Sequence, residues 1–346
     1  MGRAMAGPRV RLKDIADSTG FSVNTVSLAL RDSPRIPEDT RRRIREAAEA
    51  LDYLPNQVAK SLVSRETRTI GLVLTDVTNP VLTRVAQAVE LMLAARGYAT
   101  LFATSNNDPA EEVRVLETFR ARQVDGMLVY PRSHGRLEHI RRLRQANHPV
   151  VLLVGDPDSG LDAVCIDERR GAYKATRHLV DIGHRRIALI DSSRALGNLE
   201  KSEGYRQALA DSGIAFAPEL VADPQGHSVA HGYWAFSHVL AAAERPTAVL
   251  AANDSLALGG LRWCQSRGLR VPRDLAVFGF DNIEFGEYAA TPLSSVDYPV
   301  ETVARLAVQR LLELIGAGGD LPPPRVTMID PDLIVRESSI GRRDRP

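Results

Sequence analysis

The sequence predicts an α/β protein with an all-α N-terminal head followed by two lobes, each built on a parallel β-sheet. Two short helical patterns hinged at Gly20 predict the head, and a regular alternation of β-rich runs with amphipathic stretches from residue 69 onward predicts the sheets. Such alternation produces parallel sheets with helices on both faces. Seven or more strand–helix units are too many for one small sheet. The pattern restarts near residues 167–168, which predicts the division into two lobes.

Residues 12–31 predict a helix-turn-helix. Leu12, Ile15 and Ala16 have the spacing of one apolar helix face, Gly20 supplies a turn, and Ser22 stands where an N-cap belongs. In the second helix the apolar face is Val26, Ala29 and Leu30, and the side chains left to point elsewhere are Val23, Asn24, Thr25, Ser27 and Leu28. This pattern is typical of units whose second helix enters the DNA major groove. The alternative is that both helices belong to a larger helical core.

The residues that follow favour the DNA-binding interpretation. Pro37 opens a third helix, whose apolar face completes a three-helix unit with Ile44, Ala47, Ala48 and Leu51. Arginines crowd the same stretch at Arg31, Arg35, Arg41, Arg42, Arg43 and Arg45. Arginines of this kind contact phosphates and position a DNA reader, whereas contacts to base edges specify the sequence. Residues 1–66 carry 12 Lys and Arg against 9 Asp and Glu, and the remainder 32 against 34, a modest asymmetry that places nucleic-acid contacts in the head.

Composition sets broad limits on the protein. A chain of 346 residues is long enough for two or three domains, and 44% apolar with 25% charged residues is ordinary for a globular protein. The N-terminal residues lack the apolar region of a secretory signal, and no apolar run approaches membrane-spanning length. Cys165 and Cys264 stand in apolar surroundings without metal-ligand spacing. We therefore expect a soluble, cytoplasmic protein with buried free thiols and without a metal or cofactor.

The body of the chain offers a candidate ligand site at the ends of its strands. The expected strands are 69–75, 98–103, 126–130, 150–154, 186–190, 248–252 and 275–280, and the helical stretches between them include 81–96, 111–122, 169–182 and 255–267. In open parallel sheets, ligands bind beyond the carboxyl ends of the strands. The polar residues that follow the expected strands are therefore candidates: Asp76, Asn79, Ser105, Asn106, Tyr130, Asp191, Asn253 and Asp281.

Several segments resemble the LacI/GalR family of bacterial repressors. The head carries FSVNTVSLALR, IPEDTRRRI and YLPNQVAKSL, and the body carries GHRRIALI, KSEGYRQAL, ANDSLALG, VFGFDN and PDLIVRESS. Each motif alone is weak, but their order is specific and covers nearly the whole chain. The resemblance implies a helix-turn-helix domain over residues 8–54, a hinge helix or linker over 55–67, and a periplasmic-binding-protein-like effector and dimerisation domain over 68–346. It implies a first lobe of about 68–167 and 296–327, and a second of about 168–295 and 328–341, with crossovers near Glu168, Ser295 and Thr327.

For DNA, the resemblance implies a hinge that folds on the operator and wedges a leucine into a minor-groove step. By position that leucine is Leu62, although the segment alone also fits a flexible linker. The expected DNA-contacting residues are Leu12, Lys13, Ser22, Val23, Asn24, Thr25, Ser27, Leu28, Arg31, Arg35, Thr40, Tyr53, Asn56, Ala59, Lys60 and Leu62. Leu28 departs from the family, because many relatives have Arg there. It offers only apolar contact, for example to a thymine methyl group, so we expect a changed preference at the facing base pair.

For the effector, the resemblance implies a sugar or sugar derivative bound between the lobes by Thr75, Asp76, Asn79, Ser105, Tyr130, Lys201, His227, Asn253 and Asp281. Carboxylates and amides with aromatic rings nearby suit polyhydroxylated ligands. Asn253 is also a natural N-cap, and Asp281 a natural turn residue. Lys201 stands where family members commonly have Arg and cannot make the same bidentate contact. His227, near an aromatic position of some sugar-responsive members, is suited to cover a ring, bind a carboxylate when protonated, or lie in a loop.

The resulting hypothesis is a homodimeric repressor that binds a palindromic operator in double-stranded DNA under the control of a small effector. A transport-type binding protein is the first alternative, and the DNA-binding head and missing signal count against it. An enzyme is the second, but the sequence lacks a Walker loop, GxSxG, GxGxxG after the first strand, and paired metal ligands. His134 and His139 are expected to be solvated. An architectural DNA binder without an effector is the third alternative, which a cavity that accepts no small molecule would favour.

Overall fold

The computed structural model describes residues 10–54, 66–155, 157–193, 197–242 and 244–340. It divides into two compact units, Met1–Thr67 and Arg68–Pro346, each of which is described by itself. The helices within the described ranges are all too short or too polar to cross a membrane. The hinge region predicted over residues 55–67 lies almost wholly outside the described residues.

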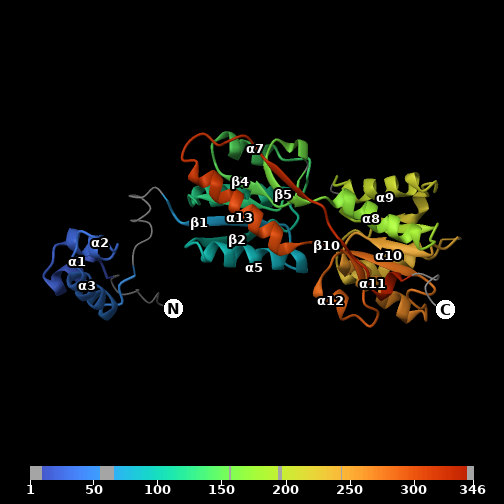
Figure 1. Cartoon of the computed structure of the whole chain (residues 1–346), viewed down its shortest axis with the longest axis horizontal. Helices are drawn as coiled ribbons and strands as arrows, with labels where there is room; N and C mark the ends of the chain where they lie inside the picture. The colour runs from blue at the N-terminus through green and yellow to red at the C-terminus, as the bar shows by residue number, and fades with distance from the viewer. Residues whose placement is uncertain (1–9, 55–65, 156, 194–196, 243, 341–346) are drawn as a thin grey trace, which may run out of the picture. The chain divides into compact units, whose positions relative to one another are not determined.

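Within residues 10–54, which the structure describes, the first unit forms a head of three helices (Figure 1). Its helices are α1 (Leu12–Thr19), α2 (Val23–Ala29) and α3 (Glu38–Ala50). Ile15, Val26, Ala29 and Ile44 are fully buried where the three helices meet, which confirms the apolar faces predicted from their spacing. Gly20 ends α1 in the left-handed conformation, with φ 78°, a backbone region that glycine enters without steric cost.

The second unit begins with a lobe built on a six-stranded parallel sheet in the order β11-β5-β4-β3-β1-β2. Its strands are β1 (Thr69–Leu74), β2 (Ala99–Thr104), β3 (Gly126–Val129), β4 (Val150–Leu152), β5 (Asp162–Ile166) and β11 (Val326–Ile329). The helices α5 (Pro80–Ala94) and α13 (Val300–Gly316) cover one face, and α6 (Pro109–Ala121) and α7 (Glu138–Gln145) cover the other (Figure 1). Side chains alternate along a strand, so Leu72 packs toward α5 and Val73 toward α6.

The second lobe repeats this three-layer arrangement on a six-stranded sheet in the order β12-β10-β9-β8-β6-β7. Its strands are β6 (Ile187–Ile190), β7 (Val221–Ala222), β8 (Ala248–Ala251), β9 (Ala276–Asp281), β10 (Ser294–Asp297) and β12 (Leu333–Ile334), of which only the edge strand β12 is antiparallel to its neighbour. The helices α8 (Glu168–Asp181) and α9 (Glu200–Asp211) cover one face, and α10 (Val229–Val239) and α11 (Asp254–Ser266) the other. The short helix α12 (Glu284–Glu287) follows β9.

The chain crosses between the lobes after β5, after β10 and after β11 (Figure 1). The first two crossings lie close to the expected positions at Glu168 and Ser295. The third lies later than expected, because β11 continues through Thr327 to Ile329 in register with β5. Residues 328 and 329 therefore belong to the first lobe.

The predicted fold class is confirmed. Each of the expected strands and helices is present with ends displaced by at most about two residues, a usual uncertainty. The strands that the sequence pattern missed are β5, β7, β10, β11 and β12. Two of these, β7 and β12, have only two residues each, and β5 and β10 begin with polar residues that the fold buries, Asp162 and Ser294.

Candidate functional site

The second helix of the head keeps one side uncovered. Val26 and Ala29 are buried against α1 and α3, whereas Ser22, Val23 and Asn24 are exposed at the start of α2. The predicted N-cap is confirmed, since the Ser22 hydroxyl accepts a hydrogen bond of 3.1 Å from the Thr25 amide. Thr25, Ser27 and Leu28 are half-buried on the same helix. The first turn of α2 can therefore approach base edges without rearrangement of the core.

The remaining predicted DNA contacts of the head are spread around its surface. Lys13, Arg31 and Arg35 are exposed, and the Arg31 guanidinium donates to the carbonyl and hydroxyl oxygens of Ser27 at 3.1 and 3.0 Å. Leu12, Thr40 and Tyr53 are half-buried, and of these Leu12 and Tyr53 pack against the core of the head. Asn56, Ala59, Lys60 and Leu62 lie outside the described residues.

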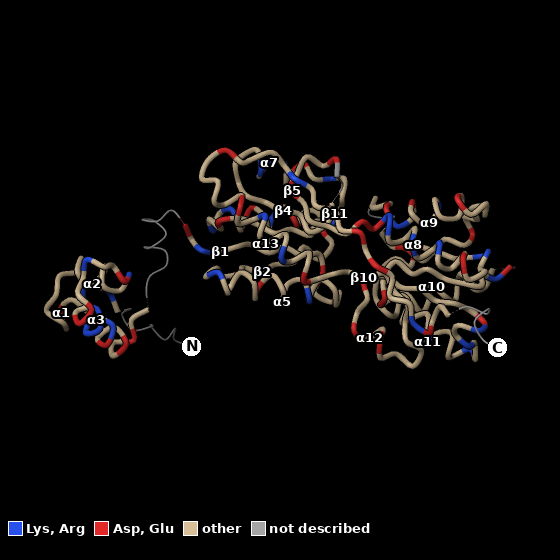
Figure 2. The backbone as a smooth tube through the Cα atoms, viewed as in Figure 1, with Lys and Arg blue, Asp and Glu red and all other residues tan. Residues whose placement is uncertain are grey.

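The arginine-rich stretch is less free than its sequence indicates. The helix α3 carries both basic and acidic residues (Figure 2). Arg41 pairs with Glu38, Arg42 with Asp39 and Arg45 with Asp32, whereas the Arg43 guanidinium lies 5.3 Å from the centre of the Phe21 ring. Several arginines expected to contact phosphates thus have acidic partners within the head. Exposed pairs of this kind contribute at most about 1 kcal/mol, so a phosphate can compete for them.

A polar cavity between the two lobes forms the second site, which we call the interlobe cavity. Its walls come from segments that follow strands in both sheets. The cavity is lined by Thr75, Asp76, Asn79, Val81, Leu82, Asn107, Tyr130, Pro131, Arg132, His134, Glu168, Asp191, Ser192, Ser193, Asn198, Lys201, His227, Ala252, Asn253, Asp281 and Tyr298. The structure thus brings together every predicted effector residue except Ser105. That residue is fully buried and does not line the cavity.

Lys201 is fixed by carboxylates of the second lobe. Its ammonium donates to Glu168 Oε1 at 3.0 Å and lies 4.5 Å from the centre of the Phe280 ring. Burial alone would lower the pKa of Lys201, but the charges of Glu168, Asp281 and Asp191 outweigh it and raise the pKa. Lys201 therefore stays protonated and is already engaged with an acid.

Asn253 and Asp281 face the cavity from adjacent strand ends, β8 and β9. The Asn253 side chain caps α11 by accepting from the Leu256 amide at 2.8 Å, and it also donates to the His227 carbonyl at 3.4 Å. Asp281 is the last residue of β9, with a φ of 108°, and not a turn residue after the strand. Burial raises the pKa of Asp281, and the Lys201 charge only partly opposes it. Both side chains thus line the cavity, Asn253 from the cap of α11 and Asp281 from the end of β9.

Buried Asp254 holds in place the segments that carry Asn253 and Asp281. Asp254 accepts hydrogen bonds from the Ile283 amide at 2.8 Å and from the Ser295 hydroxyl at 2.6 Å. Burial raises the pKa of Asp254 to about 7. These two hydrogen bonds link the start of α11, which follows Asn253, to the segment that follows Asp281 and to strand β10. Asp254 itself does not line the cavity.

Asp191 presents an unsatisfied oxygen. It is fully buried, and its Oδ1 accepts from the amide and hydroxyl of Ser193, whereas its Oδ2 has no hydrogen-bond partner among the described residues. Burial raises the pKa of Asp191. An unpaired buried acceptor costs free energy, so a ligand hydroxyl that donates to Oδ2 would be favoured.

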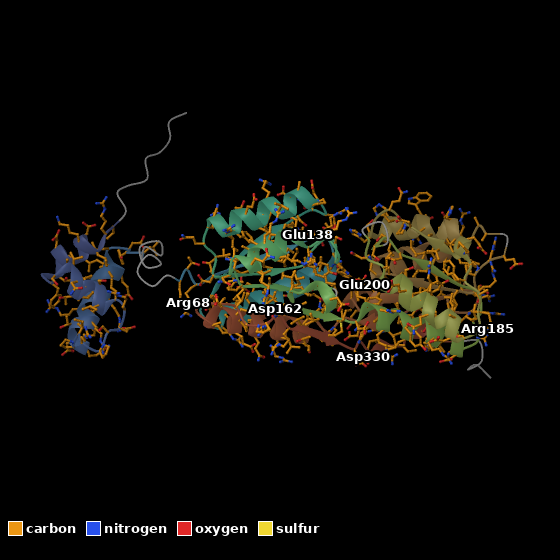
Figure 3. All side chains as sticks on the ribbon, turned by 90° about the horizontal axis from the view of Figure 1, so that it is seen from above. Arg68, Glu138, Asp162, Arg185, Glu200 and Asp330 are labelled. Atoms are coloured by element: carbon orange, nitrogen blue, oxygen red, sulfur yellow. The ribbon has the colours of Figure 1, made fainter. Side chains whose placement is uncertain are left out.

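The prediction that His134 is solvated is wrong, whereas His139 is partly exposed and also has an acidic partner. His134 is buried and its Nδ1 lies 2.7 Å from Glu200 Oε1, and His139 Nε2 lies 2.7 Å from Glu112 Oε1. Their partners are distant in the sequence, which explains the error. The His134–Glu200 pair links the lobes, and Glu200 lies at their junction in Figure 3. His227 lies in the cavity wall, with Nε2 3.9 Å from Asp76 Oδ2.

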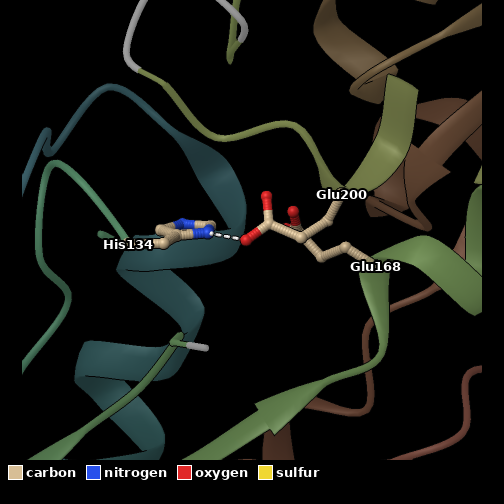
Figure 4. Close-up of side chains that lie close together, drawn as sticks. All are labelled: His134, Glu168 and Glu200. Atoms are coloured by element: carbon tan, nitrogen blue, oxygen red, sulfur yellow. Dashed lines mark hydrogen bonds and ion pairs between the residues drawn. The ribbon is translucent and has the colours of Figure 1, made fainter. Parts of the chain in front are cut away.

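His134, Glu168 and Glu200 form a group with one ligand atom each within 4.8 Å of one another (Figure 4). His134 and Glu200 are joined by their own hydrogen bond, and Glu168 accepts from the Lys201 ammonium. Burial opposes the charge of Glu200, but the hydrogen bond from His134 outweighs it and lowers the pKa of Glu200. Lys201 already supplies the positive charge that an ion would bring. We therefore interpret the group as two separate contacts, the His134–Glu200 pair between the lobes and the Glu168–Lys201 pair within the second lobe.

A head of this kind and a two-lobed, cavity-bearing body together define a DNA-binding regulator with a ligand-binding domain. Residues 11–56 match the model for bacterial regulatory proteins of the lacI family, and residues 176–339 match that for a periplasmic binding protein-like domain. The chain belongs to the LacI family of bacterial regulatory proteins. This confirms the resemblance carried by its motifs.

The relatives agree along nearly the whole chain. A ribose operon repressor from Haemophilus influenzae is 32% identical and aligns over 94% of this chain and 98% of its own length. The transcriptional repressor PurR from Aliivibrio fischeri is 33% identical over 96% and 98%. A solved complex of the transcriptional regulator CelR with cellobiose is 29% identical, covers 95% of this chain and all of its own, and superposes with a TM-score of 0.71. These relatives are regulators and not enzymes, and this chain is likewise a DNA-binding transcriptional repressor of the family.

Proposed function

We propose that this chain binds a palindromic operator as a homodimer, and that a small molecule in the interlobe cavity controls its affinity for DNA. The observation that carries the proposal is the presence in one chain of a head with an uncovered α2 and a cavity whose polar walls belong to two lobes. A ligand that contacts both lobes favours the lobe arrangement that it fits best. Because its target is bacterial DNA, the protein acts in the cytoplasm.

For DNA, we assign base reading to the first turn of α2, chiefly to Val23, Asn24 and Leu28, and phosphate contacts to Lys13, Arg31 and Arg35. Two heads on related half-sites multiply the few base contacts of one head, which supports a two-fold dimer and a palindromic operator. The hinge contacts of Asn56, Ala59, Lys60 and Leu62 stay predictions.

For the effector, we infer a sugar or sugar derivative. Asn253, Asp281 and the unpaired oxygen of Asp191 can bind hydroxyl groups, and the Tyr130 and Tyr298 side chains offer aromatic surface. The cellobiose bound by one relative supports the class of ligand. Coupling between effector and operator is reciprocal and needs only about 1–3 kcal/mol. This cavity is compatible with either direction of control. The effector can be an inducer, which releases the repressor from DNA, or a corepressor, which promotes DNA binding.

The test begins with selection of operators from a random double-stranded DNA library by the full chain. We expect an inverted repeat, a dimeric mass at micromolar concentration, and a change of operator affinity of about 5- to 150-fold when an effector is added. Asn253→Ala with Asp281→Ala should abolish the effector response and retain operator binding. Asn24→Ala should do the reverse, with operator binding weakened and ligand-induced thermal stabilisation retained. A monomer without operator preference, or an operator affinity unchanged by every cavity ligand, would contradict the proposal.

A further inference from the structure

The basic side chains of the interlobe cavity differ in whether they have acidic partners. Lys201 pairs with Glu168, His134 with Glu200, and His227 lies beside Asp76. Within the ranges that the structure describes, the Arg132 guanidinium has no ion pair, and its Nε is buried without a hydrogen-bond partner. A desolvated donor without an acceptor costs free energy that a bound anion would recover. The Arg132 guanidinium is therefore the basic group of this cavity that is available to bind a ligand.

The backbone around Arg132 is held from both lobes. Its amide donates to Glu112 Oε2 at 2.8 Å within the first lobe. From the second lobe, the Asn198 side chain donates to the Arg132 carbonyl at 3.3 Å and accepts from the His134 amide at 2.9 Å. The main chain of this turn is thus fixed by side chains of Glu112 and Asn198. The Arg132 side chain is the part left to line the cavity.

We propose that Arg132 forms an anion subsite and that the effector is an anionic polyol, with a carboxylate or phosphate at Arg132 and hydroxyl groups at the second-lobe wall. This inference rests on the proposed role of the cavity as the effector site. A guanidinium presents a planar fork that matches either anion with two parallel hydrogen bonds. The opposite wall, with Asp191, Asn253 and Asp281, offers acceptors for hydroxyl groups.

The acidic residues of the cavity do not prevent an anion from binding. Lys201 lies among Glu168, Asp191 and Asp281 and offsets part of their negative charge, and burial raises the pKa of both aspartates. Lys201 and His227 are poor candidates for the anion contact, because each faces a carboxylate already. The cavity is therefore polarised, with an available cation on the first lobe and hydroxyl acceptors on the second.

Thermal unfolding of the full chain with matched probes tests this assignment. The probes are glucose, gluconate, glucuronate and glucose 6-phosphate, the corresponding galactose and ribose series, and inorganic phosphate, all at constant ionic strength. The proteins are wild type, Arg132→Gln, Arg132→Lys and the control Arg136→Gln. Arg136 is exposed in the same turn and does not line the cavity, so its substitution removes the same charge from the surface.

We expect at least one anionic polyol to raise the melting temperature of the wild type and of Arg136→Gln, while its neutral parent has a smaller effect. In Arg132→Gln its dissociation constant should rise about tenfold to a hundredfold, and Arg132→Lys, which keeps the charge without the fork, should lie between. The preferred member of a series then identifies the anion as carboxylate or phosphate. The unliganded melting temperatures of the variants check that each protein is folded.

Three results would overturn the proposal: equal stabilisation of wild type and Arg132→Gln by the anions, tighter binding of a neutral sugar that is indifferent to Arg132, or no effect of any anionic polyol. None of these results decides the proposed function. That function is judged by operator selection, and a neutral sugar that alters operator affinity would sustain it while the anion subsite failed.

Discussion

Asp162 is predicted to be a major determinant of the stability of the first lobe. It is fully buried at the start of β5, where it accepts hydrogen bonds from Arg144, from Arg310 Nε at 2.7 Å and from the Arg325 amide at 3.0 Å. Figure 3 shows Asp162 within the first lobe. The Arg144 and Arg310 guanidiniums also donate to the carbonyls before β11. One carboxylate thus joins α7, α13 and the segment leading into β11.

Asp162→Asn retains the size of the side chain but removes its charge. The Arg144 guanidinium then loses its acidic partner, and the Arg310 guanidinium keeps only Glu313, at 3.3 Å. The exposed fractions of the Arg144 and Arg310 side chains are 13% and 9%, so water can compensate them only in part. Removal of one partner from a buried ion network costs about 3–5 kcal/mol. At about 2–4 °C per kcal/mol for a domain of this order of size, the melting temperature should fall by roughly 6–20 °C.

Urea unfolding followed by circular dichroism, together with thermal unfolding, measures the change. Asp181→Asn is the matched control, because it removes one carboxylate from the exposed Arg177–Asp181 pair, whose N–O distance is 3.0 Å. Surface pairs usually contribute no more than about 1 kcal/mol, so the control should unfold almost as the wild type does. A loss for Asp162→Asn that is below about 1 kcal/mol, or equal to that of the control, would refute this account of the buried network.

Three further predictions concern the head and the cavity. Ser22→Ala should destabilise α2 by about 1 kcal/mol through loss of its cap to Thr25, and amide hydrogen exchange in the full chain should accelerate in α2 but not in α3. Leu28→Arg should change operator preference at one base pair of each half-site toward guanine; an unchanged preference at every position in the selection experiment would exclude that contact. Because the pKa of Asp254 is about 7 in the folded chain and about 3.9 when unfolded, the folded state binds more protons between these values. The Asp254 carboxyl therefore stabilises the folded state at about pH 4, and this stabilisation is lost as the pH rises to 7. Over that range the urea midpoint of Asp254→Asn should decline less than that of the wild type. An identical decline would contradict the assignment.

The sequence predicts residues of the interlobe cavity because the ends of strands follow from local patterns. Asp76 and Asn253 line the cavity because each closely follows a parallel strand, and Asp281 lines it because it is the last residue of one. The rule fails where the orientation of a side chain depends on tertiary packing. Ser105 follows β2 as expected but turns into the interior, and Asn107, two residues later, lines the cavity instead.

Local sequence patterns could not predict contacts between residues that are distant in the sequence. His134 looks solvated in its polar segment, but its partner Glu200 is 66 residues away and belongs to the other lobe. Asp162 looks like a poor strand residue, but it is held by arginines from α7 and α13. In both cases the residue type is unfavourable locally, and the cost is offset by contacts that exist only in the folded chain.

Tertiary contacts also determine which charged side chains of the cavity are available to a ligand. Lys201 departs from the family in the sequence, but it pairs with Glu168. Arg132 has no acidic partner among the residues that the structure describes. The lobes are already joined by Asn198 and by the His134–Glu200 pair. A ligand that merely filled the cavity with equal affinity in both lobe arrangements would not shift their populations. Control of DNA binding therefore requires contacts that differ between the arrangements, and a ligand that bridges Arg132 on the first lobe and Asp281 on the second would make such contacts.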